Sequence, residues 1–185
     1  MASSKREQLI STAQSLFARE GYHATGIDRI LAESGVAKMT LYKHFRSKDE
    51  LILAVLAQRE RQTLDDLARL RGARSPREAL LLTFDGLHAW INQGDFCGCS
   101  FIHAAAEFHD RDHPIHRQAA DFKAAFAGHF HELLLALGAA QSELLAAQLQ
   151  FLLEGALSMA HVQGPGEQAL QARAAAEVLL SAAGV

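Results

Sequence analysis

The 185-residue sequence contains few residues that interrupt helices, and it has no long apolar run. Proline occurs at only three positions, whereas alanine and leucine are abundant, so the composition favours helices. No apolar stretch approaches the roughly 20 residues that a bilayer-spanning helix needs. The opening residues, MASSKREQ, contain no apolar segment of the kind found in signal peptides. We therefore expect an all-α, cytoplasmic protein without membrane contact.

Cysteine is equally scarce, with Cys97 and Cys99 separated by a single residue. A disulfide between them would be strained and would close no useful loop, so we expect two reduced thiols. Apolar residues make up 49% of the chain and charged residues 21%, which excludes a disordered or fibrous protein.

Acidic residues are absent between positions 36 and 48, although the formal net charge of the chain is −3. The same segment carries Lys38, Lys43, His44, Arg46 and Lys48. This concentration of positive charge on a mildly acidic chain favours contact with a nucleic acid at one place.

Capping signals and glycines divide the chain into about nine helices. Ser4 with Glu7 and Ser47 with Glu50 have the spacing of a capping box, and Ser75 precedes Pro76 at a first helical position. The second helix is expected to start after Thr25 as its cap. The expected helices cover approximately residues 4–20, 26–34, 37–45, 47–70, 75–92, 99–108, 114–137, 142–163 and 167–183.

The second and third expected helices have the layout of a helix-turn-helix, with Gly35, Val36 and Ala37 between them. In the third helix Leu41 and Phe45 can face inward, which leaves a cationic and aromatic face outside. In a major groove, residues 37–40 would reach base edges, while residues 42–44 and two helix N-termini would reach phosphates. The predicted DNA contacts are Thr25, Ala37, Lys38, Met39, Thr40, Tyr42, Lys43, His44 and Lys48. On charge alone, the same helix could be a solvated face with Tyr42 packed inside.

Residues 21–51, GYHATGIDRILAESGVAKMTLYKHFRSKDEL, resemble the DNA-binding head of TetR-family regulators. Two positions depart from the usual pattern, because Ala37 replaces a common serine and Arg46 a common proline. The resemblance implies a helix-turn-helix DNA-binding domain over residues 1–48 and an effector-binding and dimerisation domain over residues 49–185. It also implies a homodimer on double-stranded operator DNA, acting as a repressor that a small-molecule effector releases.

The same resemblance implies that the fifth to seventh helices, with part of the eighth, enclose an effector cavity. It implies as well that the last two helices form a four-helix bundle with those of a second subunit. Apolar stripes at 145, 149, 152, 156 and 159 and at 170, 174, 178 and 179 permit this. An intramolecular core could use the same stripes, and periodicity does not distinguish the two.

The segment from Cys97 to Glu107 resembles a pattern found in one group of TetR-like regulators, with His103 where asparagine is usual. Cys99, His103 and Glu107 are spaced four apart, so they lie near one helix face and could hydrogen-bond a ligand. The predicted ligand-binding residues are Phe84, Leu87, Trp90, Ile91, Cys99, His103, Glu107, Phe122, Phe126 and Phe151.

Other interpretations of the cysteines and histidines stay open. Cys97, Cys99, His103, His109, His113 and His116 are near one another in sequence. Such side chains could bind zinc or copper, and Cys99 near a helix N-terminus could sense thiol-reactive compounds. An enzyme that uses Cys99 and His103 lacks an evident oxyanion site or orienting acid. We expect no catalytic residue, no resident metal and no cofactor.

Overall fold

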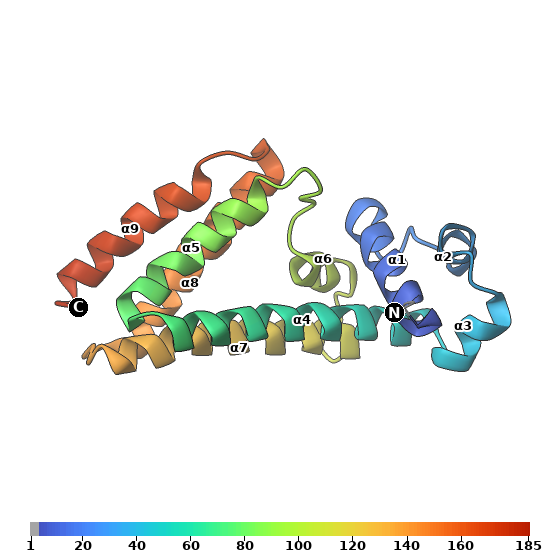
Figure 1. The fold of residues 1–185 in the computed structure, drawn as a ribbon, viewed down its shortest axis with the longest axis horizontal. Coiled ribbons are helices and arrows are strands. Elements are labelled where there is room, and N and C mark those ends of the chain that lie inside the picture. The colour runs from blue at the N-terminus through green and yellow to red at the C-terminus, as the bar shows by residue number, and fades with distance from the viewer. Residues whose placement is uncertain (1–3) are drawn as a thin grey trace. The chain divides into compact units, whose positions relative to one another are not determined.

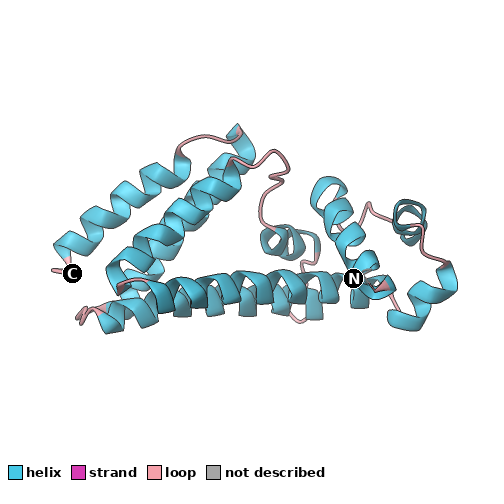
Figure 2. Ribbon diagram, viewed as in Figure 1, coloured by secondary structure: helices cyan, strands magenta, loops and turns pink. Residues whose placement is uncertain are grey.

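The computed structural model describes residues 4–185, and within them it contains nine α-helices and no strand (Figures 1 and 2). The first three residues of the expected DNA-binding segment 1–48 lie outside the described part. The helices are α1 (Lys5–Glu20), α2 (Ile27–Ser34), α3 (Lys38–His44), α4 (Lys48–Ala73), α5 (Pro76–Ile91), α6 (Ser100–Glu107), α7 (Pro114–Ala136), α8 (Ser142–Gln163) and α9 (Gln168–Ala182). The all-α fold predicted from the sequence is confirmed. No helix among these residues is both long and apolar enough to cross a membrane.

Side-chain caps fix several helix starts as predicted. Ser4 and Ser75 each form a reciprocal capping box with a glutamate three residues on, and Pro76 occupies the first turn of α5. The Ser47 hydroxyl accepts a hydrogen bond from the Glu50 amide at 3.1 Å. The predicted cap at Thr25 is wrong, because Gly26 precedes α2 and the Thr25 hydroxyl donates to the Gly21 carbonyl at 2.7 Å.

Contacts group the chain into two compact units, which we describe separately. The first, here the head unit, comprises the residues up to Arg61 together with Ser100–Phe122. Its core includes apolar side chains of α1, α3 and the start of α4, among them Leu16, Leu41 and Leu51. This grouping differs from a boundary at residue 48, because α6 and the start of α7 belong with the helix-turn-helix.

The second unit, here the body unit, comprises Gln62–Cys99 and Lys123–Val185. In it α5, α8 and α9 pack against one another, as Figure 1 shows. Small residues of α9 such as Ala172 and Ala176 are buried there, which permits close helix approach. The predicted α8 stripe is mostly internal, because Leu145, Leu149 and Ala156 are buried within the single chain.

A neutral histidine joins three helices inside the body unit. His129 on α7 is 1% exposed, and its Nδ1 accepts a hydrogen bond from Arg71 at 3.0 Å. The Thr83 hydroxyl donates to the Ala79 carbonyl, so the His129 Nε2–H donates to Thr83 Oγ1 at 3.1 Å. Burial and the nearby Arg71 charge lower the pKa of His129 from 6.5 to about 4.

This pKa predicts an acid-sensitive body unit. The folded state binds the His129 proton more weakly than the unfolded state does, so stability is complete above about pH 6.5 and declines as the pH falls toward 4. The expected loss is about 3 kcal/mol over that window. Urea unfolding at fixed protein concentration at several pH values measures it. The free energy of unfolding should depend less on pH in His129→Gln than in the loop variant His109→Gln. The same pH dependence in both variants would contradict the lowered pKa of His129.

Candidate functional site

The helix α3 presents a polar and cationic face to solvent. Its buried residue Leu41, followed by the buried Phe45 after its end, anchors the other side in the head-unit core. Exposed along α3 are Lys38, Met39, Tyr42, Lys43 and His44, while Thr40 is partly exposed. The interpretation in which Tyr42 packs inside is wrong, because this side chain is 45% exposed.

A tight turn places α3 against its neighbours. Gly35 ends α2 with φ of +63°, a left-handed conformation that favours glycine. Ala37, the residue before α3, is exposed and makes no side-chain cap. Lys38 pairs with Asp28 of α2 at 3.4 Å, so part of its charge is neutralised on the surface. Lys43 and His44, in the last turn of α3, lie on the exposed face, and neither forms an ion pair with an acidic side chain among residues 4–185.

Two predicted DNA contacts have internal partners. Thr25 is fully buried, so its side chain is a structural element of the turn between α1 and α2. Lys48 is partly exposed, and its ammonium donates to the His23 carbonyl at 3.2 Å. Burial lowers the pKa of Lys48, while the Glu107 and Asp49 carboxylates oppose that shift. The exposed cationic surface therefore centres on α3.

Met39 is the most exposed large apolar side chain on this surface, at 83%. It lies at the N-terminal end of α3, the end that would meet base edges in the major-groove docking that the sequence predicts. Replacing Met39 with alanine removes the predicted apolar contact with a base edge, so base preference should change at that position by ~1–3 kcal/mol, or about 5- to 150-fold. Selection of duplexes from a random library by both proteins measures this, and identical selected sequences would exclude a base contact.

The predicted ligand-binding residues of the body unit are largely internal. Phe84, Leu87, Ile91 and Phe126 are buried, and Trp90 is partly exposed with its ring against Phe96. Phe84 and Phe126 both pack near Phe130, with ring centroids 6.0 and 5.7 Å from it. These residues therefore share the interior of one unit. The exception is Phe151 on α8, which is 72% exposed and not brought into that interior.

Cys99 lies beside a charged pair that the sequence analysis missed. Lys123 Nζ is 3.5 Å from the Cys99 sulfur and 2.5 Å from Glu154 Oε1, and the Lys123 carbonyl accepts from Gln150. Lys123 is the single charged residue among residues 122–128 of α7, and this break in an apolar segment is the sequence signal that could have indicated its role. Sensing of thiol-reactive compounds through Cys99 stays a prediction.

The other three predicted ligand residues belong to the head unit. Phe122 is buried and stacks on Phe101 with ring centroids 3.8 Å apart, and His103 is partly exposed. Both carboxylate oxygens of Glu107 accept hydrogen bonds from backbone amides, at Tyr22 and His23. Glu107 therefore has structural partners within the head unit, and its contact with a ligand stays a prediction.

The metal-sensing interpretation gains no support from the described residues. Within 4–185, no three His, Cys, Asp or Glu side chains are grouped as metal ligands would be. His116 Nδ1 instead donates to the Phe108 carbonyl at 2.7 Å, and His113 stacks on the Phe108 ring.

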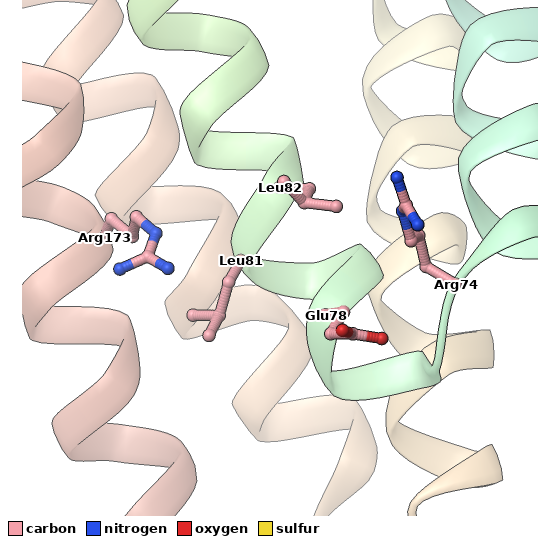
Figure 3. A pocket seen from close by; sticks show the side chains of 5 residues that line it. All are labelled: Arg74, Glu78, Leu81, Leu82 and Arg173. Atoms are coloured by element: carbon pink, nitrogen blue, oxygen red, sulfur yellow. The ribbon is translucent and has the colours of Figure 1, made fainter.

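An open surface pocket in the body unit is lined by Arg74, Glu78, Leu81, Leu82 and Arg173 (Figure 3). None of the predicted ligand-binding residues lines it. Arg173 already pairs with Asp85 and Glu177, and Glu78 completes the cap of α5. Two of the three charged side chains of this pocket, Glu78 and Arg173, therefore have structural partners, and we do not assign a ligand to it.

Apolar side chains also gather on the outer sides of α8 and α9. We call them the outer face, comprising the exposed residues Leu144, Phe151, Met159, Val162, Leu170 and Val178. On α8 the members recur at helical spacing, with the exposed Gly155 between Phe151 and Met159. The α9 stripe predicted from sequence is thus partly outward, since Leu170 and Val178 are exposed.

Comparison with known proteins identifies the head. Residues 9–55 match the family model described as "Bacterial regulatory proteins, tetR family". The HTH-type transcriptional activator FasR of Mycolicibacterium smegmatis is 44% identical over 80 residues, which cover 37% of this chain and 36% of FasR. The HTH-type transcriptional regulator YjdC of Escherichia coli is 26% identical over 83% of this chain and 82% of its own.

Solved structures extend the likeness to the whole chain. A TetR-family transcriptional regulator from Streptomyces coelicolor has 31% identity and a TM-score of 0.93, covering 98% of this chain and 96% of that one. A second regulator of this type, from Streptomyces avermitilis, has 31% identity and a TM-score of 0.84, covering 99% and 100%. The helix-turn-helix is thus a DNA-binding element, and the chain belongs to the TetR family of transcriptional regulators.

Proposed function

We propose that this regulator is a homodimeric repressor whose two α3 helices hold operator DNA and which a small-molecule effector releases. The observation that carries the proposal is the exposed face of α3, with Met39, Tyr42 and Lys43 available to a partner. A protein that acts on the chromosome works in the cytoplasm of a bacterial cell, which fits the sequence expectation.

The outer face supports the dimer. Large apolar side chains exposed together on a single chain mark an interaction surface, because water contact with them is unfavourable. A second copy of the chain would present the same α8 and α9 residues, so a twofold axis would pair like with like. In such a dimer Phe151 lies in the subunit interface, which explains why this side chain is exposed in the single chain. Twofold proteins match twofold operators, with one α3 in each of two major grooves.

We propose that the bound protein represses transcription by occupying the operator, in preference to activating it. FasR is named an activator, and its match is confined to 37% of this chain, so its mode of action does not transfer. We propose that the effector binds among the interior aromatic residues of the body unit, with Phe84 and Phe126 as candidates. Release requires that the effector bind the DNA-free shape more tightly than the DNA-bound shape.

The direct test is a gel shift with DNA from upstream of the gene that encodes this chain. We expect a specific complex whose affinity falls steeply as salt rises, because basic side chains displace counterions from phosphates. An unrelated duplex of equal length is the control. Equal affinity for both duplexes, or no complex at low salt, would argue against operator binding.

A further inference from the structure

The turn between α1 and α2 is bonded to the last residue of α6. Glu107 Oε1 accepts from the Tyr22 amide at 2.8 Å, and Glu107 Oε2 accepts from the His23 amide at 2.6 Å. Both partners are main-chain groups, and hydrogen bonds to a carboxylate are shorter and stronger than neutral ones. One side chain thus fixes two consecutive peptide groups, more than 80 residues away in sequence.

Other contacts join the same two segments. The Tyr22 hydroxyl donates to the carbonyl of Ser100, the first residue of α6, at 3.0 Å. The His23 Nε2–H donates to the Glu107 carbonyl at 2.9 Å, and the His23 ring lies 4.7 Å from the ring of Phe108. Both ends of the short helix α6 are therefore bonded to residues 22 and 23. Figure 1 shows α6 beside α1, in agreement with these contacts.

The backbone at Gly21 is shaped to admit this carboxylate. Gly21 has φ of +86°, and a Cβ atom built there would lie 3.1 Å from Glu107 Oε1. A side chain at position 21 would therefore be strained by the backbone and would crowd the carboxylate. The glycine that ends α1 also makes room for α6.

A cation holds the opposite side of the turn. Lys48, the first residue of α4, donates to the His23 carbonyl at 3.2 Å, and the Glu107 charge favours its protonated form. His23 thus gives its N–H to α6 and its C=O to α4. The turn that leads into α2 and α3 is bonded from two helices at once.

We infer that Glu107 is a positioning residue that ties α6 to the turn at residues 21–23 and thereby sets the orientation of the reading helix α3. The inference rests on the proposed function, because it makes α6 a helix through which effector binding would change DNA binding. The sequence placed α6 with the effector-binding residues, and Cys99 immediately precedes it. Contacts instead group α6 with the helix-turn-helix. Any movement of α6 would therefore carry the turn with it.

The first measurement is amide hydrogen exchange in the full-length protein without DNA. Glu107→Gln keeps the size of the side chain but places an NH₂ group, a donor, against one of two N–H donors. We expect the Tyr22 and His23 amides to exchange at least tenfold faster. The control is Ala106→Gln, which adds an amide at the exposed neighbouring position of α6. Unchanged exchange at both amides would overturn the inference.

The second measurement separates positioning from general stability. The unmodified protein first selects a duplex from a random library, and one base pair is then inserted between its half-sites. A variant that only lowers the fraction of folded protein should bind the selected duplex and the lengthened duplex more weakly by the same factor. If Glu107 sets the orientation of α3, Glu107→Gln should reduce the preference for the selected spacing at least fivefold. An unchanged ratio of affinities would overturn the inference.

Tyr22→Phe provides a second variant if Glu107→Gln does not fold. It removes the bond to the Ser100 carbonyl and leaves the aromatic packing, so we expect a smaller change in the same direction. An unchanged spacing preference in a folded Tyr22→Phe protein would then count against the inference. Failure of the unmodified protein to select any duplex would contradict the proposed function, while the exchange experiment still tests Glu107.

Discussion

Phe151→Glu is expected to convert the dimer into monomers and to reduce operator affinity by at least about 100-fold. Phe151 is the second most exposed apolar member of the outer face, with Leu144 and Met159 each about two turns away on α8. A carboxylate there would have to lose its hydration in the subunit interface, which is costly without a partner. Two separate heads no longer share one duplex, so the gain from bivalent binding, about 10²- to 10⁴-fold, disappears.

Light scattering gives the mass in solution, and titration of the selected duplex gives the affinity. Phe151→Leu keeps an apolar side chain and should stay dimeric. Leu135→Glu places the same charge at an exposed apolar residue of α7, outside the outer face, and should also stay dimeric. A dimeric Phe151→Glu protein with unmodified affinity would show that α8 does not hold the subunits together.

Lys43→Glu is expected to weaken binding to all duplexes on the order of 100-fold, with little effect on folding. Lys43 is exposed on α3 and faces the partner in the proposed complex, so reversal of its charge replaces attraction to phosphate by repulsion. Because a dimer carries the change twice, the slope of log affinity against log salt should become shallower by about 2.

The matched control is Arg61→Glu, which makes the same charge change at an exposed residue of α4. It should alter the salt slope little, since Arg61 is not on α3. Affinity curves at several salt concentrations distinguish the two variants. If Arg61→Glu and Lys43→Glu weakened binding equally, the effect would come from net charge, and α3 would lose its assigned role.

The helix boundaries of the head unit could be predicted from the sequence, because the residues that set them act on their near neighbours in the chain. Ser4, Gly35 and Ser47 act on residues within one turn of themselves, and each lies where the helix boundary was expected. Thr25 shows the limit of such reasoning. Its hydroxyl could cap α2 or bond backward to Gly21, and only the folded turn decides between them.

The body was less predictable because packing partners are distant in sequence. Helix periodicity located an apolar stripe on α8, yet it could not tell that Leu149 faces inward while Phe151 faces outward in a helix with apolar residues on both sides. The roles of Glu107 and Lys123 likewise depend on partners many residues away, Tyr22 and Glu154. No local spacing encodes such pairs.

The most direct test of the account is a hydroxyl-radical footprint of the full-length protein on a duplex that it has selected from a random library. We predict two protected segments related by a twofold axis, with centres separated by a whole number of helical turns. At a protein concentration that just saturates the duplex with the unmodified protein, Lys43→Glu should leave both segments unprotected. Protection of a single segment, or a footprint that persists unchanged in Lys43→Glu, would contradict the claim that two α3 helices hold the operator.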